Sequence, residues 1–161
     1  MCKKILLITF VSFFLTSVCS AATAFFAGGC FWCMQSPFDT EKNNGVISTR
    51  VGYTGGSKEN PTYTEVSSGV TGHREAIEVT YDAKKISYKQ LLKIFWSNID
   101  PYDGQGQFCD KGEQYTSAVF YNNEDEKKEA LASSPKGIIK TSFLPAKKFY
   151  PAEEYHQSYY R

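Results

Sequence analysis

The chain has few of the residues that bind metals and no glycine pattern that binds a dinucleotide. It contains two histidines, and Cys30 and Cys33 form its one Cys-x-x-Cys pair. The other potential ligands, Cys109, His73 and His156, are scattered singly along the sequence. A structural zinc site takes four ligands, usually in close pairs, and a dinucleotide loop needs closely spaced glycines. We therefore expect no metal, flavin or nicotinamide cofactor.

The body of the chain also lacks a charge excess, repeats and long apolar runs. Its 161 residues include 18 Lys and Arg and 17 Asp and Glu, which gives a net charge of +1. No basic stripe or charged tail is present, which argues against nucleic acid as a partner. The length fits one domain with one core. We expect a soluble domain that acts as a monomer.

One long apolar run is present, at the N-terminus. Lys3 and Lys4 precede fourteen uncharged residues, Ile5 to Val18, and small residues follow in "SAATA". This layout is typical of a secretory signal peptide, and the run is short for a membrane span. We predict a signal peptide at residues 1–21 and export to the periplasm or another extracytoplasmic space. If the signal is not cleaved, it would act as a membrane anchor.

The cysteines indicate a reactive thiol. Cys2 and Cys19 lie in the predicted signal, which leaves Cys30, Cys33 and Cys109. An odd number of cysteines in an exported protein suggests a working thiol and not only structural disulfides. An exported compartment is oxidising, so a dithiol there needs a dedicated reductant.

Strand and helix patterns alternate along the chain. Strands are expected at residues 23–29, 74–82 and 115–121, and residues 46–56 are expected to begin as a strand and end in a glycine turn. Helices are expected from residue 32 to about 40, limited by Pro37, and at 123–134, and the clearest one follows the capping-box pair Ser87 and Gln90. Residues 57–72 and 100–114 read as long loops, and the tail from Leu144 should wrap on the body. The pattern predicts a two-layer α/β (α+β) sandwich with a mixed sheet, flanking helices and long functional loops, arranged as a ferredoxin-like plait.

The stretch "GGCFWC" places Cys30 where a thiol can be activated. A strand and two glycines precede Cys30, and a predicted helix follows it. Helix N-terminal N–H groups and a second thiol at this spacing stabilise a thiolate. Phe31 and Trp32 beside an exposed thiol are expected to form an apolar wall for a small substrate group. A structural Cys30–Cys33 disulfide and a thioredoxin-like disulfide exchanger are the alternatives, although the usual thioredoxin motif has a preceding Trp and an internal Pro.

Four separated segments extend this motif: residues 26–38, 52–79 with "GYTGG" and "TGHREA", 95–121 with "FCDKGEQY", and 144–160 with "YHQ". Together they resemble the peptide methionine sulfoxide reductase A family, in its "CFWC" subgroup. The resemblance covers nearly all of residues 22–161, which would form a single catalytic domain. It implies a peptide-methionine (S)-S-oxide reductase. Such an enzyme returns the S epimer of methionine sulfoxide, free or in proteins, to methionine and so repairs oxidised proteins.

The resemblance assigns roles to four residues around the reacting sulfoxide. Cys30 matches the nucleophile that attacks the sulfoxide sulfur. Glu75 matches the acid that protonates the oxygen, and Tyr63 and Tyr115 match tyrosines that hydrogen-bond it. To hold a proton near neutral pH, Glu75 needs an apolar pocket that raises its pKa.

The resemblance also implies a substrate pocket. Asp110 matches an acid that binds the polar end of the substrate, and Phe31 and Trp32 match the pocket for its methyl group. His73 is expected to bond the backbone locally, and His156 to pack against the site loops. Neither histidine is assigned direct chemistry.

Attack would leave Cys30 as sulfenic acid, which condenses readily with a second thiol. Cys33, three residues on, is the preferred resolving residue, because the two Cα atoms could lie about 5–6 Å apart. Cys109, beside Asp110, is the alternative. The sequence has no cysteine after Cys109, so it departs from family members that resolve through a C-terminal tail. The disulfide would be reduced by a thioredoxin-like protein or another dithiol.

Two other hypotheses remain open. Substitution of Glu75 distinguishes the first of them from a sulfoxide reductase. A thiol–disulfide exchange module using Cys30 and Cys33 should tolerate Glu75→Gln, whereas a sulfoxide reductase needs the acid. A catalytically inactive domain held by a disulfide predicts no turnover.

Overall fold

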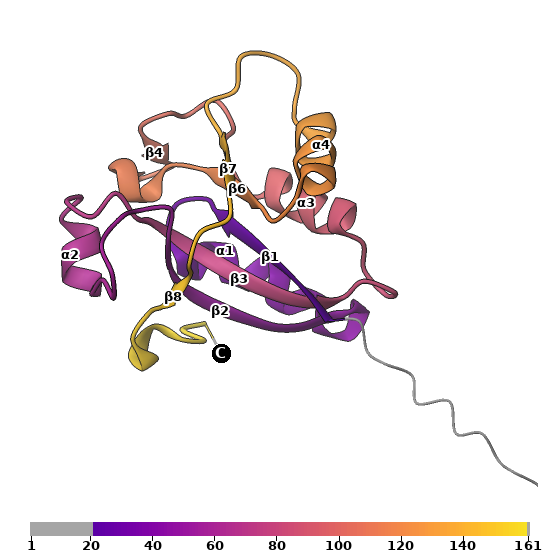
Figure 1. Ribbon diagram of the computed structural model, residues 1–161, viewed down its shortest axis with the longest axis horizontal. Helices are drawn as coiled ribbons and strands as arrows, with labels where there is room; N and C mark the ends of the chain where they lie inside the picture. Colours follow the sequence, from indigo (N-terminus) through magenta and orange to yellow (C-terminus); the bar gives the residue numbers. More distant parts are fainter. Residues whose placement is uncertain (1–20, 161) are drawn as a thin grey trace, which may run out of the picture.

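The computed structural model describes residues 21–160, so the predicted signal peptide lies almost entirely outside the described residues. A six-stranded sheet runs in the order β7-β6-β1-β3-β2-β8 (Figure 1). Its strands are β1 (Ala21–Ala27), β2 (Val46–Thr54), β3 (Arg74–Asp82), β6 (Ala118–Tyr121), β7 (Ser142–Pro145) and β8 (Tyr150–Pro151). A separate hairpin pairs β4 (Gly106–Gln107) with β5 (Asp110–Lys111).

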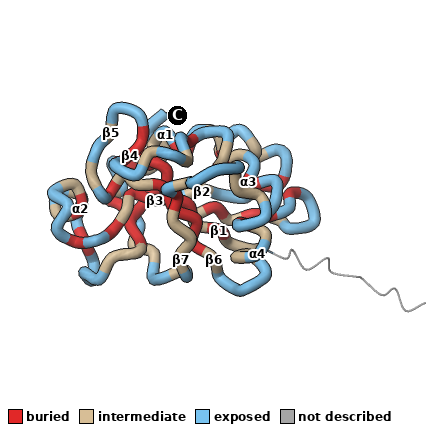
Figure 2. Tube along the Cα trace, turned by 90° about the horizontal axis from the view of Figure 1, so that it is seen from above, coloured by how far each residue is buried: buried red, intermediate tan, exposed pale blue. Residues whose placement is uncertain are grey.

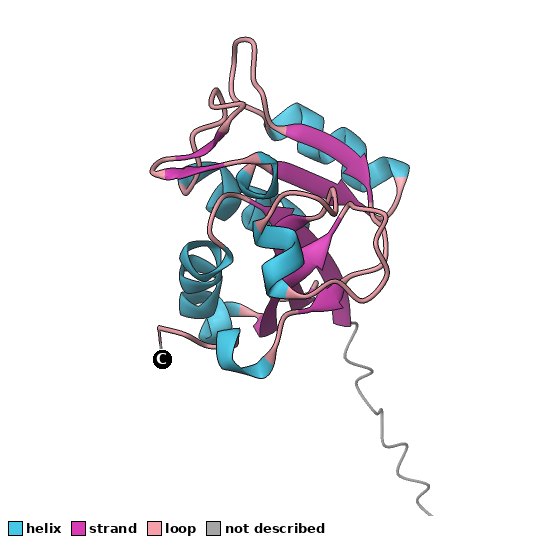
Figure 3. Ribbon diagram, turned by 90° about the vertical axis from the view of Figure 1, so that its left-hand side faces the viewer, coloured by secondary structure: helices cyan, strands magenta, loops and turns pink. Residues whose placement is uncertain are grey.

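Four α-helices accompany these strands in the described part of the chain (Figure 3). They are α1 (Phe31–Asp39), α2 (Tyr63–Ser67), α3 (Tyr88–Ser97) and α4 (Glu124–Ser133). The order β1-α1-β2-β3-α3-β6, with β6, β1, β3 and β2 as antiparallel neighbours, is a ferredoxin-like plait. The parallel pair β6–β7 makes the sheet mixed. The predicted sandwich of a mixed sheet with flanking helices is confirmed.

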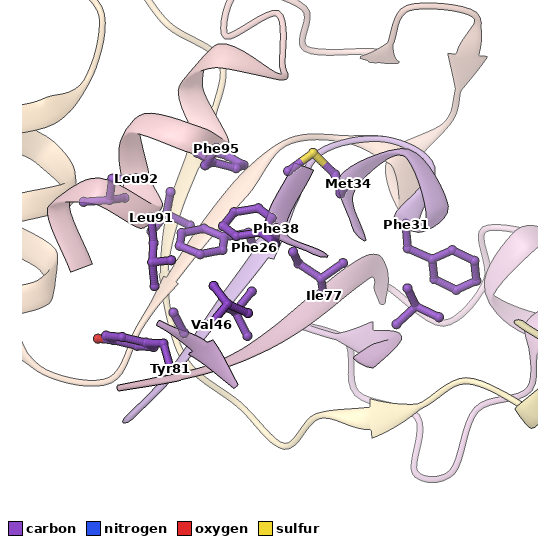
Figure 4. Close-up of a cluster of buried hydrophobic side chains, with 14 of the residues drawn as sticks. Phe26, Phe31, Met34, Phe38, Val46, Ile77, Tyr81, Leu91, Leu92 and Phe95 are labelled. Atoms are coloured by element: carbon purple, nitrogen blue, oxygen red, sulfur yellow. The ribbon is translucent and has the colours of Figure 1, made fainter. Parts of the chain in front are cut away.

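The main core lies between the sheet and helices α1 and α3 (Figures 2 and 4). Because successive side chains of a strand point to opposite faces, Phe26 of β1 faces this core while Phe25 faces the other side. The Phe26 ring stacks on Phe38 of α1, with centroids 5.4 Å apart, and on Phe95 of α3, at 5.2 Å. These contacts fix α1, and with it the start of the helix, against the sheet.

The C-terminal tail covers the opposite face, as predicted. Its side chains Leu144, Ala146 and Phe149 pack on a small cluster centred on Phe120. The tail then pairs with the sheet edge, where β8 meets β2 at Gly52 and Tyr53. The tail therefore runs across the sheet and reaches the side on which α2 lies (Figure 1).

Four local expectations were wrong. Pro37 does not limit α1, which continues to Asp39 and into a 3₁₀ turn. The proline only removes the amide that would bond the carbonyl of Cys33. The expected loop at 57–72 contains α2, capped by a box between Thr62 and Glu65, and the loop at 100–114 contains the β4–β5 hairpin. The strand expected from Tyr115 begins at Ala118.

No helix among residues 21–160 is long and apolar enough to cross a membrane.

Candidate active site

Cys30 lies at the junction of β1 and α1. Gly28 and Gly29 follow β1, and Cys30 is the N-cap residue of α1. Gly29 has φ +83°, and a Cβ built there would lie 2.8 Å from the Cβ of Gln107 in β4. A larger residue therefore fits neither the conformation nor the space. The close approach packs the β4–β5 hairpin against the residue that precedes the thiol.

Cys30 is half-buried, and the backbone N–H groups of Cys33 and Trp32 face its sulfur and act to lower its pKa, although the side chain makes no capping hydrogen bond to α1. This is the geometry predicted for a thiol at a helix start. Burial nevertheless raises the pKa of Cys30 to about 11, with the N–H groups opposing it and the charges of Cys33 and Glu75 adding to it. The thiol is therefore protonated at neutral pH, and the helix start alone does not ionise it.

Glu75 lies at the start of β3, with its side chain toward α1. It is 2% exposed, and its Oε2 accepts a hydrogen bond from the N–H of Phe31 at 3.0 Å. Burial raises its pKa to about 7; the Phe31 N–H opposes the shift, and the charge of Asp110 adds to it. The assigned role of Glu75 requires a carboxyl that keeps its proton near neutral pH, and this buried environment raises the pKa accordingly.

Two tyrosines and an aspartate complete the cluster. Tyr63 is the first residue of α2, Tyr115 ends a 3₁₀ turn, and each side chain acts on the pKa of the other. Burial and the charge of Glu75 raise the pKa of Tyr63, and raise that of Tyr115 to about 12. Asp110 in β5 acts electrostatically on both Glu75 and Tyr115. Residues from distant parts of the sequence thus meet around the Cys30 thiol.

The two aromatic residues after Cys30 have different environments. Phe31 is 1% exposed and belongs to the core, where its ring lies 6.4 Å from that of Tyr63 (Figure 4). Trp32 is half-buried, donates its indole N–H to the carbonyl of His156 at 2.9 Å and stacks on Tyr159 with centroids 4.0 Å apart. Trp32 therefore supplies the accessible apolar surface beside the thiol, and Phe31 lies behind it.

Both candidate resolving cysteines are exposed free thiols. Cys33 lies in the first turn of α1, where it raises the pKa of the neighbouring Tyr160 hydroxyl. Cys109 lies in the turn between β4 and β5, the hairpin that packs on Gly29. Cys33 is tied to Cys30 by chain spacing, and Cys109 lies on a hairpin that adjoins the site.

The remaining predictions concern the histidines and metals. The His73 ring bonds backbone groups, as expected, but not local ones: its Nδ1 accepts from the N–H of Gly56 at 3.2 Å and its Nε2 lies 2.8 Å from the carbonyl of Lys58, 17 and 15 residues away in the sequence. The buried His156 ring packs 4.4 Å from the ring of Tyr63. No group of three or more His, Cys, Asp or Glu within residues 21–160 could hold a metal.

Sequence reasoning missed the contribution of the C-terminal tail. Glu153 bonds the hydroxyl of Tyr53 and the N–H of Tyr63, and Gln157 bonds the backbone of Val51. These contacts span 90 to 106 residues of sequence, so no local pattern could have revealed them. The sequence signal for these contacts is the stretch "AEEYHQ", which contains the motif "YHQ" and from which the sequence predicts only packing of His156.

A half-buried thiol, a buried carboxyl with a pKa near neutral and two tyrosine hydroxyls define a thiol-dependent oxidoreductase site. A family model described as peptide methionine sulfoxide reductase matches residues 22–161. The MsrA of Bacillus licheniformis is 51% identical over 146 residues, which cover 86% of this chain and 80% of that protein. The MsrA of Streptococcus agalactiae is 49% identical, over 86% and 85% of the two chains.

Solved structures agree with this assignment. Methionine sulfoxide reductase A of Corynebacterium diphtheriae superimposes with a TM-score of 0.79 at 31% identity, over 90% of this chain and 76% of that one. Mxr1 from Saccharomyces cerevisiae in its reduced form gives a TM-score of 0.79 at 31% identity, over 86% and 83%. The chain belongs to the peptide methionine sulfoxide reductase family. It is a thiol-dependent methionine sulfoxide reductase of the A type.

Proposed function

We propose that the enzyme reduces the S epimer of methionine sulfoxide, free or in proteins, with Cys30 as nucleophile and Glu75 as general acid. The observation that carries this assignment is the buried Glu75 carboxyl, which is hydrogen-bonded to the residue after the thiol and has a pKa of about 7. Thiol–disulfide exchange breaks no S–O bond and leaves no oxygen to protonate. A sulfoxide oxygen, in contrast, must gain protons as its bond to sulfur breaks.

The first step is an oxygen transfer. The Cys30 sulfur attacks the sulfoxide sulfur and an S–S bond forms, while the thiol proton and the Glu75 proton pass to the oxygen, which leaves as water when the S–O bond breaks. Water then attacks the Cys30 sulfur, the S–S bond breaks, methionine leaves and the Glu75 carboxylate takes back a proton. The net products are methionine, whose sulfur gains two electrons, and Cys30 sulfenic acid, whose sulfur loses them. Burial keeps Tyr63 and Tyr115 protonated at neutral pH, so both hydroxyls are available to donate to the oxygen.

The next step regenerates a reducible form of the enzyme. The Cys33 thiol attacks the sulfenic sulfur of Cys30, which forms a disulfide and releases water. Cys109 is the second candidate for this role. A dithiol then attacks the disulfide, leaves as its own disulfide and restores both enzyme thiols. Cys33 is the more exposed sulfur of the pair and the natural point of attack.

A thioredoxin-like protein is the proposed electron donor. In one solved structure, Mxr1 from Saccharomyces cerevisiae is in complex with Trx2. That Mxr1 chain resembles this protein in fold at 22% identity and a TM-score of 0.56. The requirement for a dithiol follows from the chemistry, because each turnover leaves two enzyme sulfurs oxidised.

Export is part of the proposal. Its support is the sequence of residues 1–21, with two lysines, an apolar run and small residues before a possible cleavage point. The reductase would then repair proteins in the periplasm or another extracytoplasmic space, with its donor delivered there. N-terminal sequencing of the protein recovered from that compartment tests this, and an intact Met1 on recovered protein would contradict cleavage.

Reduction of a racemic methionine sulfoxide peptide with dithiothreitol tests the activity. The wild-type domain is expected to stop near half conversion, because one epimer remains. Cys30→Ser should leave the peptide untouched. Conversion of both epimers would overturn the epimer assignment. An unchanged peptide together with reduction of a model disulfide would overturn the assigned site roles and support the exchange module.

A further inference from the structure

One carboxylate of the C-terminal tail joins two parts of the active site and has no part in the steps above. Glu153 accepts a hydrogen bond from the N–H of Tyr63 through Oε1 at 2.9 Å. Its Oε2 accepts another from the hydroxyl of Tyr53, also at 2.9 Å. Tyr53 is fully buried in β2 and lies directly opposite Glu75 in the β2–β3 ladder. The carboxylate therefore links Tyr63 to the strand pair that carries the acid.

The position of Tyr63 depends on such a link, because α2 is only five residues long. The first N–H groups of a helix have no partner inside it. The capping box satisfies the N–H groups of Thr62 and Glu65, and of the two that it leaves, Tyr63 and Thr64, that of Tyr63 takes its acceptor from outside the helix. Glu153 supplies the missing acceptor from 90 residues further along the chain.

The same tail holds the Tyr63 side chain. His156 is 3% exposed, and its ring lies 4.4 Å from the Tyr63 ring and 5.4 Å from that of Phe31. Neither nitrogen of the His156 ring has a hydrogen-bond partner in the structure. The ring thus acts here as a packing surface. The tail fixes the backbone of Tyr63 through Glu153 and its ring through His156.

We infer that Glu153 is a positioning residue for sulfoxide reduction, acting as a strut that sets the Tyr63 hydroxyl relative to Glu75. The inference rests on the proposed function, in which Tyr63 donates to the sulfoxide oxygen. A hydrogen-bond donor contributes to such a step only if it is held where charge develops, and small displacements are costly.

The ionisation of the two partners suits this arrangement. Burial alone would raise the pKa of Glu153, but the hydrogen bonds from the N–H of Tyr63 and the Tyr53 hydroxyl hold it below its ordinary value. Burial and Glu153 both raise the pKa of Tyr53, which keeps that phenol a donor. At neutral pH a carboxylate thus faces two donors.

The test compares three substitutions of Glu153 with saturating dithiothreitol. Glu153→Ala removes both acceptors and is expected to lower kcat at least ten-fold, with a smaller change in KM. Glu153→Gln should retain most of kcat, because its oxygen accepts from Tyr63 and its NH₂ donates to the oxygen of Tyr53. Glu153→Asp is too short to reach both donors and should resemble Glu153→Ala. Glu154→Ala, at the exposed neighbouring residue, is the matched control and should leave kcat unchanged.

A double-mutant cycle with Tyr63→Phe separates positioning from general destabilisation. If Glu153 acts through the Tyr63 hydroxyl, adding Glu153→Ala to Tyr63→Phe should lower kcat little further. Wild-type kcat in Glu153→Ala would overturn the positioning role of Glu153 and leave the proposed function intact. The same holds if the loss of kcat in the double variant equals the product of the two single losses. Wild-type kcat in Tyr63→Phe would instead overturn the assigned role of Tyr63, and the strut with it. If Glu153→Ala does not fold, the same comparison is made with Glu153→Asp.

Discussion

The backbone N–H of Phe31 donates to Oε2 of Glu75 at 3.0 Å, across 44 residues of sequence. This bond ties the first residue of α1 to the start of β3, and therefore the Cys30 thiol to the buried acid. Nucleophile and acid are held by backbone, not by flexible side chains alone. The hydrogen bond also favours the ionised carboxyl, so the elevated pKa of Glu75 comes from burial acting against it.

Glu75→Gln should abolish most activity. Loss of a general acid typically costs about 10²–10⁴-fold, and the amide keeps the shape of the carboxyl. In the wild type the thiolate fraction of Cys30 grows with pH up to its pKa of about 11, while the protonated fraction of Glu75 falls above its pKa of about 7. The rate of the chemical step should therefore rise with pH below 7 and level off above 7. The variant should lack this ionisation. Single-turnover rates from pH 5 to 9 measure both effects, and a variant that keeps the wild-type rate and pH profile would rule out Glu75 as the acid.

The ionisation of Glu75 should also change the free energy of unfolding. Below pH 4.5 Glu75 is protonated in the folded and unfolded states, so it has no effect. Between pH 4.5 and about 7 the unfolded state ionises while the folded state does not, so the free energy of unfolding falls as pH rises. The loss is on the order of 3 kcal/mol and is complete above pH 7.

Urea unfolding at pH 5 and pH 8 measures this loss as a difference between wild type and Glu75→Gln. Comparing the two proteins cancels the pH dependence of all other groups. The variant should gain stability relative to wild type at pH 8 and not at pH 5. An equal difference at both pH values would show that Glu75 does not carry the shifted ionisation.

Much of the fold was predictable because its signals are local. The alternation in residues 74–82 fixed which face of β3 is buried, and the Ser87–Gln90 capping box marked the start of α3. Thr62 and Glu65 form the same kind of capping box, but the many turn residues around them favour a loop over the short helix α2. A proline in a helix interior is usually disruptive, so Pro37 predicts a shorter helix than the one observed. In the structure the neighbouring Phe38 stacks on Phe26 and fixes this part of α1 against the sheet.

The active site was predictable only in part. The motifs supplied residue identities, and the fold then brought Cys30, Glu75, Tyr63 and Tyr115 together. Burial decides the electrostatics, and burial is a tertiary property, so the raised pKa of Cys30 did not follow from its place at a helix start. Contacts such as those of Glu153 also escape local patterns.

Cys30 should react slowly with alkylating reagents at neutral pH. Its pKa is raised to about 11, chiefly by burial, and the thiolate is the reactive form. The alkylation rate should therefore keep rising well above pH 9. In Glu75→Gln one of the negative charges that raise this pKa is gone, so the inflection should move to lower pH. Iodoacetamide labelling of Cys30 followed by mass spectrometry reports it, with Cys109 as the internal exposed control.

Cys33→Ser should keep the reduction of one sulfoxide but lose the regeneration of the enzyme by thioredoxin. Attack by Cys30 does not need Cys33, so one equivalent of methionine should still form per enzyme. Turnover with thioredoxin should then stop, because no disulfide forms. Cys109→Ser should retain both. Quenched-flow methionine release and peptide mapping of the oxidised enzyme check this, and a mapped Cys30–Cys109 disulfide in the wild type would transfer the resolving role to Cys109.

Gly29→Ala tests how the β4–β5 hairpin is held against the thiol. The substitution forces a non-glycine residue to φ +83° and brings a Cβ to 2.8 Å from the Cβ of Gln107. Such strain costs about 1–3 kcal/mol before any displacement of the hairpin. Gln107 is fully buried and hydrogen-bonds both the N–H and the carbonyl of Asp100, so it has little freedom to move.

Gly104→Ala, in the loop that leads into β4, is the matched control. Its Cβ would meet only the side chain of Lys140, at 3.3 Å and beyond, which can turn aside. Thermal unfolding should show a large loss for Gly29→Ala and a change within about 0.5 kcal/mol for Gly104→Ala. Reductase activity should fall in Gly29→Ala at a temperature where the variant is folded, because the hairpin that carries Asp110 must shift away from Glu75. A folded and fully active Gly29→Ala would mean that the position of the hairpin does not matter to the chemistry.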